Sequence, residues 1–441
     1  MSNLPTPVES NVSPRAAESR LTRGALQTLI SGTSIGQIIE WFDWSVYAIF
    51  APYFAQQFFP SSSPLAALLA TYVVFGVAFV VRPIGGIAFG YVADRAGRRP
   101  AFTASILLMA AGMATISVIP TYATIGLAAP VLLSVARLAQ GLSAGGEMPA
   151  ASAYLTESAP PQRRGFYSSF IWLGVGAGTL LAMLAGMGLT LLFSPDQLAD
   201  WGWRIPFGLG ALFCLYGLRL RRTLPETEAY RREHNRQIPG PRPGLRVLIR
   251  AHPGGVLRAI GFSVGGTVAF YTLAAYLPGA LRASVGISAS TAFAITAIAL
   301  VVFIVQMPLW GHLADRFGRR PIMATGAFGI ALMMAPVANA MSGTTTEVIL
   351  VLCIAMTFGA MASAPASAVL AEQFPTSVRA LGIGLPYSLA TSVFGGTAPY
   401  LAAWLDGHGL RAAYFGWVAL LCVITGLTFL TMREMAGKEL P

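Results

Sequence analysis

Charged side chains occur inside long apolar segments of this sequence. Glu40 and Asp43 lie in one such segment and fall on one helical stripe with Tyr47, because they are spaced by three and four residues. Arg82 and Arg137 lie in two further apolar segments. A charge in the membrane interior costs about 3 kcal/mol or more unless it faces protein or water, and a guanidinium cannot avoid that cost by losing its proton. These residue types predict carboxylates that carry a proton and arginines that bind an anion.

The segment that contains Arg137 also holds Gln140 and Glu147, which share one helical stripe. Arg137 and Glu147 are about 15 Å apart along a helix, so each needs a partner elsewhere or a solvated cavity. For Arg82, the two acidic residues of the first segment are the obvious partners. We expect Pro149 to bend the helix near Glu147. Two interpretations stay open for these charges: structural ion pairs between helices, or a proton and substrate site that faces a cavity.

The other polar residues of the apolar segments are uncharged. Most are expected to form ordinary hydrogen bonds between helices. Three of them are candidates for contact with a substrate: Tyr271, Gln306 and Tyr387. The aromatic residues beside the acidic pair are expected on the lipid side or the packing side of their helix: Trp41, Phe42 and Trp44. The histidines and cysteines have no metal-ligand spacing, so we predict no metal site.

Membrane-spanning helices must hold these residues. Of the 441 residues, 55% are hydrophobic and 11% are charged, whereas about a quarter of the residues of a soluble domain are charged. Helical runs of about 20 apolar residues cross a hydrocarbon core of about 30 Å. The sequence predicts such helices at 25–54, 65–92, 100–120, 125–156, 166–193, 204–222, 256–281, 288–312, 321–340, 346–372, 379–405 and 411–432.

The sequence is also duplicated. Gly90–Pro100 reads GYVADRAGRRP and Gly311–Pro321 reads GHLADRFGRRP, with eight of the eleven positions identical. A second motif, Glu-x-x-Pro-x-x-x-Arg, occurs at Glu157–Arg164 and again at Glu372–Arg379. Repeats half a chain apart indicate two related halves. We therefore predict an all-α integral membrane protein with twelve transmembrane helices in two six-helix, pseudo-symmetric bundles.

Basic residues give the orientation of these helices. Of the 29 lysines and arginines, 24 fall on one face of the predicted arrangement, and only Arg204, Arg282 and Arg411 fall on the other. By the positive-inside rule the first face is cytoplasmic, so both termini are predicted in the cytoplasm. The predicted division is an N-terminal tail, a first bundle, a cytoplasmic linker, a second bundle and a C-terminal tail: 1–23, 24–222, 223–255, 256–432 and 433–441.

Several functional classes are disfavoured. The net charge of +11 is explained by topology, so we predict a lipid bilayer as the environment and no nucleic-acid partner. The sequence contains no phosphate-binding loop, metal cluster or nucleophile–base set, which argues against an enzyme. Cys214, Cys353 and Cys422 fall inside predicted helices and are interpreted as small packing residues.

The repeated Gly-x-x-x-Asp-Arg-x-Gly-Arg-Arg motif resembles the loop signature of the major facilitator superfamily. The chain resembles the metabolite:proton symporters of that superfamily in five stretches: EWFDWSVY, VRPIGG, RLAQGLSAGGE, WGWRIPF and FGGTAPYLAAWL. The resemblance implies the major facilitator fold, a bacterial inner membrane, and transport of organic acids such as 2-oxoglutarate, citrate or shikimate, or of zwitterions such as proline and betaines. Gln37 departs from the pattern, because relatives commonly have Asn there.

Transport by alternating access requires two halves that move against each other around a central site. The repeated loop motifs lie on the predicted cytoplasmic face. The Glu157/Arg164 and Glu372/Arg379 pairs of the Glu–Arg motifs lie there too. There we expect acid–base contacts and helix-end dipoles to latch the outward-open state, as the resemblance also implies. The expected gate residues are Asp94, Arg95, Arg98, Glu157, Arg164, Asp315, Arg316, Arg319, Glu372 and Arg379.

Coupling requires a group whose protonation differs between the two openings. We expect Glu40, Asp43 and Glu147 to carry the proton, with Arg82 and Arg137 alternating between these carboxylates and an anionic substrate. The expected substrate contacts are Tyr47, Arg82, Arg137, Gln140, Tyr271, Gln306 and Tyr387. The predicted function is proton-coupled symport of a small carboxylate or a zwitterionic metabolite by a monomer, with the proton gradient in place of any cofactor. The alternatives are a proton-driven exporter of a drug or natural product, and a membrane sensor or scaffold.

Overall fold

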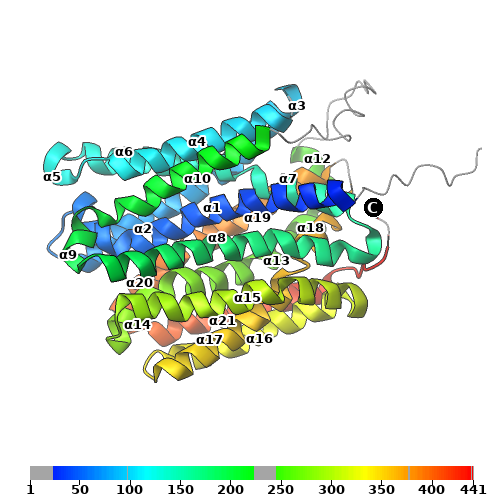
Figure 1. The fold of residues 1–441 in the computed structure, drawn as a ribbon. Helices are drawn as coiled ribbons and strands as arrows, with labels where there is room; N and C mark the ends of the chain where they lie inside the picture. Colours follow the sequence, from blue (N-terminus) through cyan, green and yellow to red (C-terminus); the bar gives the residue numbers. More distant parts are fainter. Residues whose placement is uncertain (1–22, 97, 223–244, 376–377, 439, 441) are drawn as a thin grey trace, which may run out of the picture.

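The computed structural model describes residues 23–96, 98–222, 245–375, 378–438 and 440. In these residues the protein is almost entirely helical, and the long helices lie side by side along one axis (Figure 1). Seven helices in the described part are long and apolar enough to cross a membrane. Most of the predicted N-terminal tail and of the predicted linker lies outside the described residues.

The first half contains six membrane-length segments, which match the first six predicted spans. They are α1 (Arg23–Phe58), α2 (Pro64–Val80) followed by α3 (Arg82–Ala96), α4 (Arg98–Val118), α6 (Ala128–Ala144) followed by α7 (Glu147–Ser158), α8 (Arg164–Leu192) and α10 (Arg204–Arg222). Short helical turns connect some of them: α5 (Tyr122–Ile125), η1 (Pro161–Arg163), α9 (Pro195–Gln197) and η2 (Leu198–Gly202).

The second half contains six more segments, which match the remaining predicted spans. Three segments are single helices: α15 (Ala289–Phe317), α16 (Arg319–Ala340) and α21 (Arg411–Thr431). The other three are composite. They consist of α13 (Pro253–Tyr271) with η3 (Thr272–Tyr276) and α14 (Leu277–Val285); of α17 (Thr345–Ser363) with α18 (Ala366–Ala371); and of α19 (Arg379–Ala390) with η5 (Thr391–Gly395) and α20 (Ala398–Gly407). The short helix α12 (Leu245–Ala251) precedes them, and its Leu248 is buried.

Two segments of the first half break where proline removes a backbone donor. Pro83 follows the break between α2 and α3, and Pro149 follows the break between α6 and α7. Proline cannot donate to the carbonyl four residues earlier, and its ring crowds that carbonyl. Arg82 and Glu147 are therefore each the first residue of a new helix. The bend predicted near Glu147 is confirmed.

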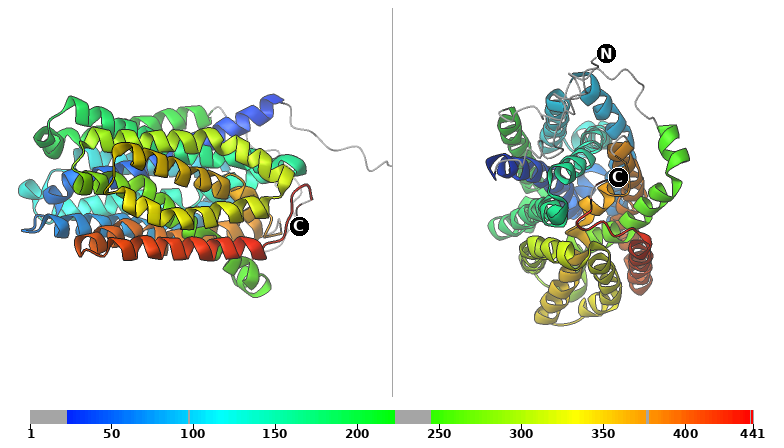
Figure 2. Two further views of the ribbon diagram at one scale, coloured as in Figure 1. Left: turned by 90° about the horizontal axis from the view of Figure 1, so that it is seen from below. Right: turned by 90° about the vertical axis from the view of Figure 1, so that its right-hand side faces the viewer.

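Seen along the helix axis, the two halves form two groups (Figure 2). The blue-to-green helices of the first half contact the second half mainly through α8 against α15, α2 against α20 and η5, and α7 against α19. Each group buries aromatic and aliphatic side chains against its neighbours. The predicted architecture of two six-helix bundles is confirmed.

The two ends of this barrel-shaped pair of bundles differ in charge. Helix α1 begins and α21 ends at the end drawn on the right of Figure 1. We name it the basic end because it carries Arg164, Arg319 and Arg379. The other end, where α5, α9 and α14 lie in Figure 1, is named the opposite end.

Candidate functional site

The predicted charged residues form two buried acid–base contacts in the first bundle. Arg82 at the start of α3 contacts the carboxylate of Glu40 on α1. Arg137 on α6 lies with Nη1 3.5 Å from Asp43 Oδ2 and donates a hydrogen bond of 2.8 Å to Gln140 Oε1. Gln140 Nε2 in turn donates to Asp43 Oδ1 at 2.7 Å. The expected partnership between Arg82 and the acidic residues of α1 is confirmed, and Asp43 and Gln140 supply the partners for Arg137.

Aromatic rings enclose both guanidinium groups. The indole ring of Trp44 lies close to both guanidinium groups. Its ring centroid is 5.0 Å from Arg82 Cζ and 4.5 Å from Arg137 Cζ. The ring of Tyr47 is 4.4 Å from the same atom of Arg137. Such contacts recover part of the cost of removing a cation from water. Both of these buried arginines therefore contact the same aromatic side chain of α1, Trp44.

The contacts of Asp43 and Arg137 leave hydrogen-bonding capacity unused. Within the described residues, no hydrogen bond reaches Asp43 Oδ2 or the Nε and Nη2 atoms of Arg137, although all three atoms are buried. Buried polar atoms without partners raise the free energy of the folded protein, because the low-dielectric interior does not solvate them. A proton or a bound anion that pairs with these atoms would lower that free energy. The arrangement suits chemistry in which Asp43 accepts a proton and Arg137 is released for an anion.

The second bundle contributes two tyrosines. Tyr271, the last residue of α13, stacks on Trp41 of α1, with ring centroids 5.8 Å apart and planes inclined by 27°. Tyr387 of α19 is buried in a cluster with Met148 and Ile171 of the first bundle. Tyr271 also meets the ring of Phe79 edge-on at a centroid distance of 5.7 Å, and the Phe79 ring lies 5.3 Å from Arg82 Cζ. We define the central site as these residues from both bundles: Glu40, Asp43, Arg82, Arg137, Gln140, Tyr271 and Tyr387.

Three other predicted residues lie differently. The hydroxyl of Tyr47 donates to the Thr71 carbonyl at 3.2 Å, so only its ring faces Arg137. Glu147 is buried as the first residue of α7. Gln306 donates to Thr357 and accepts from Trp310, both of which lie within the second bundle. Its amide is used inside that bundle, so we remove Gln306 from the site.

Three aromatic residues of α1 had no predicted role in the site: Trp41, Phe42 and Trp44. Trp41, Phe42 and Trp44 are all buried, so the lipid-facing alternative for them is wrong. Gln37, Trp41 and Trp44 are spaced by four and three residues and therefore share a stripe of α1. That spacing, beside two acidic residues, is the signal that would have placed them in the interior.

A second set of contacts joins the bundles at the basic end. Asp315 in the last turn of α15 accepts hydrogen bonds from the backbone N–H groups of Gly165 (2.9 Å) and Phe166 (2.8 Å), which open α8 of the other bundle. A carboxylate is stabilised at a helix N-terminus by the unpaired N–H groups and the helix dipole. Arg319 Nη2 holds the same carboxylate at 2.7 Å.

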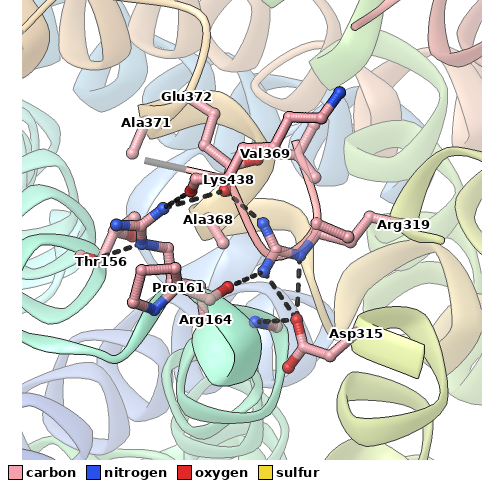
Figure 3. A network of polar contacts seen from close by, with 12 residues as sticks. Thr156, Pro161, Arg164, Asp315, Arg319, Ala368, Val369, Ala371, Glu372 and Lys438 are labelled. Atoms are coloured by element: carbon pink, nitrogen blue, oxygen red, sulfur yellow. Dashed lines mark hydrogen bonds and ion pairs between the residues drawn. The ribbon is translucent and has the colours of Figure 1, made fainter. Parts of the chain in front are cut away.

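Arginines and one buried glutamate continue this network (Figure 3). Arg319 contacts the carboxylate of Glu372, and its Nη2 donates to the Pro161 carbonyl at 3.3 Å. Arg164 approaches Glu372 from the first bundle, at 4.0 Å, and donates to the Lys438 carbonyl at 2.7 Å. Burial raises the pKa of the Glu372 carboxyl above its ordinary value, against the opposing effect of the arginines.

The duplicated Glu–Arg motifs exchange partners across the bundles. Glu157 of the first motif pairs with Arg379 of the second, 2.7 Å apart, and Arg164 of the first lies near Glu372 of the second. The sequence motifs predicted acid–base contacts within each motif, and these cross-bundle contacts were not predicted. Of the remaining predicted gate residues, Arg316 is exposed over the ring of Phe317. The side chains of three others lie outside the described part of the chain: Asp94, Arg95 and Arg98.

Two membrane-length bundles around a buried charged site, with ionic contacts between them at one end, define a transporter of the alternating-access class. The chain belongs to the sugar (and other) transporter family, whose model matches residues 29–245 and 256–441. It is a multi-pass membrane transporter of the major facilitator superfamily and is not an enzyme.

Known proteins similar to the chain agree with this assignment. The alpha-ketoglutarate permease of Escherichia coli is 38% identical over 96% of this chain and 98% of its own. The citrate-proton symporter of Klebsiella pneumoniae is 34% identical over 94% of each chain. The proline/betaine transporter of Salmonella typhimurium is 31% identical over 95% of this chain and 85% of its own. A proton:xylose symporter structure, XylE, shares the fold with a TM-score of 0.77 at 19% identity, covering 94% of this chain and 97% of its own.

Proposed function

We propose that the protein is a proton-coupled symporter that carries a small carboxylate into a bacterial cell across its inner membrane. It works as a monomer and uses the proton gradient without a cofactor. The relatives named for alpha-ketoglutarate and citrate support a carboxylate. The relative named for proline and betaine keeps a zwitterion as the competing substrate class.

One observation carries the proposal. Two buried arginines each sit beside a carboxylate of α1, and the Asp43–Arg137 contact is only partly satisfied by hydrogen bonds. Protonation of Asp43 weakens its hold on Arg137, which then binds the substrate carboxylate; loss of the proton restores the pair and releases the substrate. The pH gradient supplies the drive, because one proton moving down a difference of one pH unit releases about 1.4 kcal/mol, or about tenfold accumulation. The membrane potential adds nothing to this step, because the charge of one proton is cancelled by the charge of one carboxylate.

The basic end faces the cytoplasm in this proposal, together with both termini, because the sequence predicts 24 of the 29 lysines and arginines on the cytoplasmic face. The contacts of Asp315, Glu157 and Glu372 with the other bundle then form the cytoplasmic gate. Opening toward the cytoplasm requires all of them to separate. The equivalent contribution of Asp94, Arg95 and Arg98 stays a prediction.

Uptake by proteoliposomes tests the function. Purified protein should accumulate labelled 2-oxoglutarate or citrate when the outside is acidic, and a protonophore should abolish the accumulation. Asp43→Asn should abolish accumulation because the variant cannot exchange a proton at this position. It should retain exchange of internal for external substrate, which needs no net proton movement.

Asp406→Asn is the matched control, because Asp406 pairs with Arg411 at the opposite end, away from the central site. Accumulation in this control should stay within about twofold of the unmodified protein. Uptake that ignores the pH gradient, or full accumulation by Asp43→Asn, would contradict the proposal. Substrate efflux driven by the same gradient would favour an exporter.

A further inference from the structure

Three buried side chains, two on α1 and one on α13, have polar atoms without a hydrogen bond. Within the described residues, both amide atoms of Gln37, Nε1 of Trp41 and the hydroxyl of Tyr271 have no partner. Gln37 is 0% exposed, and the other two side chains are at most 4% exposed. A buried polar group without a partner costs about 1–3 kcal/mol. Four such groups in one place are unfavourable unless another molecule satisfies them.

The packing of these side chains does not require their polar atoms. Trp41 stacks on Tyr271 and meets the edge of Phe270 at a centroid distance of 5.3 Å, contacts that phenylalanine rings would also make. Gln37 lies tightly against α8, because a Cβ on Gly174 would be 2.9 Å from its own Cβ. An apolar side chain would fill the same space. The polar atoms therefore indicate a ligand and not a structural role.

Their positions join the three side chains to the central site. Gln37 lies one helical turn before Trp41 on the same stripe of α1, and Tyr271 faces Trp41 from the second bundle. The ring of Phe79 links Tyr271 to Arg82, because it lies 5.7 Å from the Tyr271 ring and 5.3 Å from Arg82 Cζ. It directly precedes the π turn η3, a kind of irregularity that is frequent at functional sites.

The chemistry of the three side chains selects one kind of ligand group. Each can donate: two N–H groups from Gln37, one from the Trp41 indole and one O–H from Tyr271. They carry no charge, whereas Arg82 and Arg137 lie nearby beside Glu40 and Asp43, and protonation of Asp43 leaves this cluster with one net positive charge. A quaternary ammonium group accepts no hydrogen bond and is repelled by these arginines. The ring faces that would otherwise attract it at Trp44 and Tyr47 are already covered by guanidinium groups.

We infer that Gln37, Trp41 and Tyr271 form a second, uncharged end of the substrate site, which binds the oxygens of a second carboxylate. An arginine binds the first carboxylate. The substrate class is therefore a short dicarboxylate or oxo-dicarboxylate, and not a monocarboxylate or a betaine. This inference rests on the proposed carboxylate symport and specifies which carboxylates the site accepts.

Competition against uptake of labelled 2-oxoglutarate tests the inference with acids of one chain length. Unlabelled glutarate and 2-oxoglutarate carry both ends, whereas pentanoate carries one. The unmodified protein should bind the two diacids at least tenfold more tightly than pentanoate. Trp41→Phe and Tyr271→Phe each delete one donor and keep the ring. Each should weaken diacid binding about tenfold, the effect of one hydrogen bond to a charged group, and leave pentanoate binding within about twofold.

Tyr414→Phe is the matched control, because its hydroxyl is already bonded to Thr272 Oγ1 at 2.7 Å. It should leave diacid binding unchanged and lower the unfolding temperature. Trp41→Phe and Tyr271→Phe should leave that temperature unchanged or raise it, since each removes an unsatisfied buried group.

Each remaining outcome has a defined meaning. Equal losses for the diacids and pentanoate in the Phe variants, or no loss for either, overturn the inference and leave carboxylate symport standing. Tighter binding of glycine betaine than of glutarate also overturns it. An unmodified protein that takes up no carboxylate under any gradient overturns the proposed function as well.

Discussion

The two ends of the molecule hold the bundles together by different means. At the basic end ionic and carboxylate-to-backbone contacts, as with Asp315 on the N-terminus of α8 and Glu157 on Arg379, add to close packing of Gly165 against Gly311. Toward the opposite end the contacts are close packing of small residues. A Cβ added at Gly76 of α2 would lie 3.0 Å from the Gly396 carbonyl oxygen of the second bundle.

Polar contacts between the bundles are weaker toward the opposite end. Arg282 reaches the Tyr53 hydroxyl at 3.4 Å from an exposed position. Closure by ion pairs is lost when one charged partner is removed. Closure by close packing of small residues is lost when a larger side chain is introduced. Removal of a charge should therefore weaken closure at the basic end alone, whereas added atoms should weaken closure at whichever end receives them.

The largest effect is expected from Arg319→Met at the basic end. The substitution leaves the buried carboxylate of Glu372 without its closest cation and takes one partner from Asp315. Removing one member of a buried ion pair costs about 3–5 kcal/mol. The state closed at this end should lose at least about 100-fold in relative population. Faster hydrogen exchange at the amides of Gly165 and Phe166, which Asp315 covers, would report the opening.

Arg316→Met is the matched control, because Arg316 is exposed and contacts only the ring of its neighbour among the contacts described here. It should leave the exchange rates nearly unchanged. Arg319→Met combined with Glu372→Gln should recover part of the protection, because the second change removes the stranded charge. Equal effects of the two single arginine substitutions would show that buried charge does not hold this end.

Gly76→Leu should break the packed closure, with the next largest effect. Its side chain has to fit between two backbones in contact, and overpacking of this kind costs about 1–3 kcal/mol. The ratio of the state open at the opposite end to the state closed there should rise roughly 10- to 100-fold. Gly165→Leu should instead favour the state open at the basic end, because its Cβ would lie 2.8 Å from Asp315 Oδ1.

A thiol reagent that cannot cross the membrane measures the direction of these shifts. In protein without the native cysteines, Tyr387→Cys should react faster from the opposite side with Gly76→Leu and faster from the basic side with Gly165→Leu. Gly188→Leu is the control, because no atom lies within 4 Å of its added Cβ. The same direction of shift from both substitutions would contradict the comparison.

The helices and the buried pairs could be predicted from the sequence because their causes are local. Apolar runs of membrane length specify the spans, and the cost of an isolated charge in lipid requires Arg82 to find one of few carboxylates. The exchange of Glu157 and Glu372 between the duplicated motifs could not be predicted. It depends on how two separate bundles face each other, which no local spacing records.

Two glutamines illustrate the same limit within one bundle. Gln140 and Gln306 both occur in apolar helices, yet Gln140 joins the central site and Gln306 bonds to Thr357 and Trp310. Composition does not say which face of a helix meets the other bundle. For Gln306 a local signal existed, because Trp310 is four residues further along the helix and offers a donor to it.

A smaller effect is expected from the segment that follows α21. The Lys438 carbonyl accepts from Arg164 of the first bundle, and Glu434 Oε2 accepts from the Arg320 backbone N–H at 2.9 Å. A chain ended after Met432 loses both hydrogen bonds, together worth about 1–3 kcal/mol, of which the first joins the bundles. Closure at the basic end should weaken about tenfold by hydrogen exchange. Glu434→Gln, which removes charge but not the Lys438 contact, should have less effect.

The smallest effects are expected from substitutions of single exposed polar contacts, and ionic strength should change the effect of the substitution at the basic end. Glu157 is 38% exposed, so Glu157→Gln should weaken closure at the basic end by only about 0.2–1 kcal/mol. Tyr53→Phe at the opposite end removes one long hydrogen bond and should change closure there by less. Raising the ionic strength from about 0.05 to 0.5 M screens exposed charges and should shrink the Glu157→Gln difference in amide exchange. The Gly76→Leu difference should stay constant, because packing is not screened. A Gly76→Leu effect that falls with salt as steeply as that of Glu157→Gln would mean that charge, and not close packing, holds the opposite end.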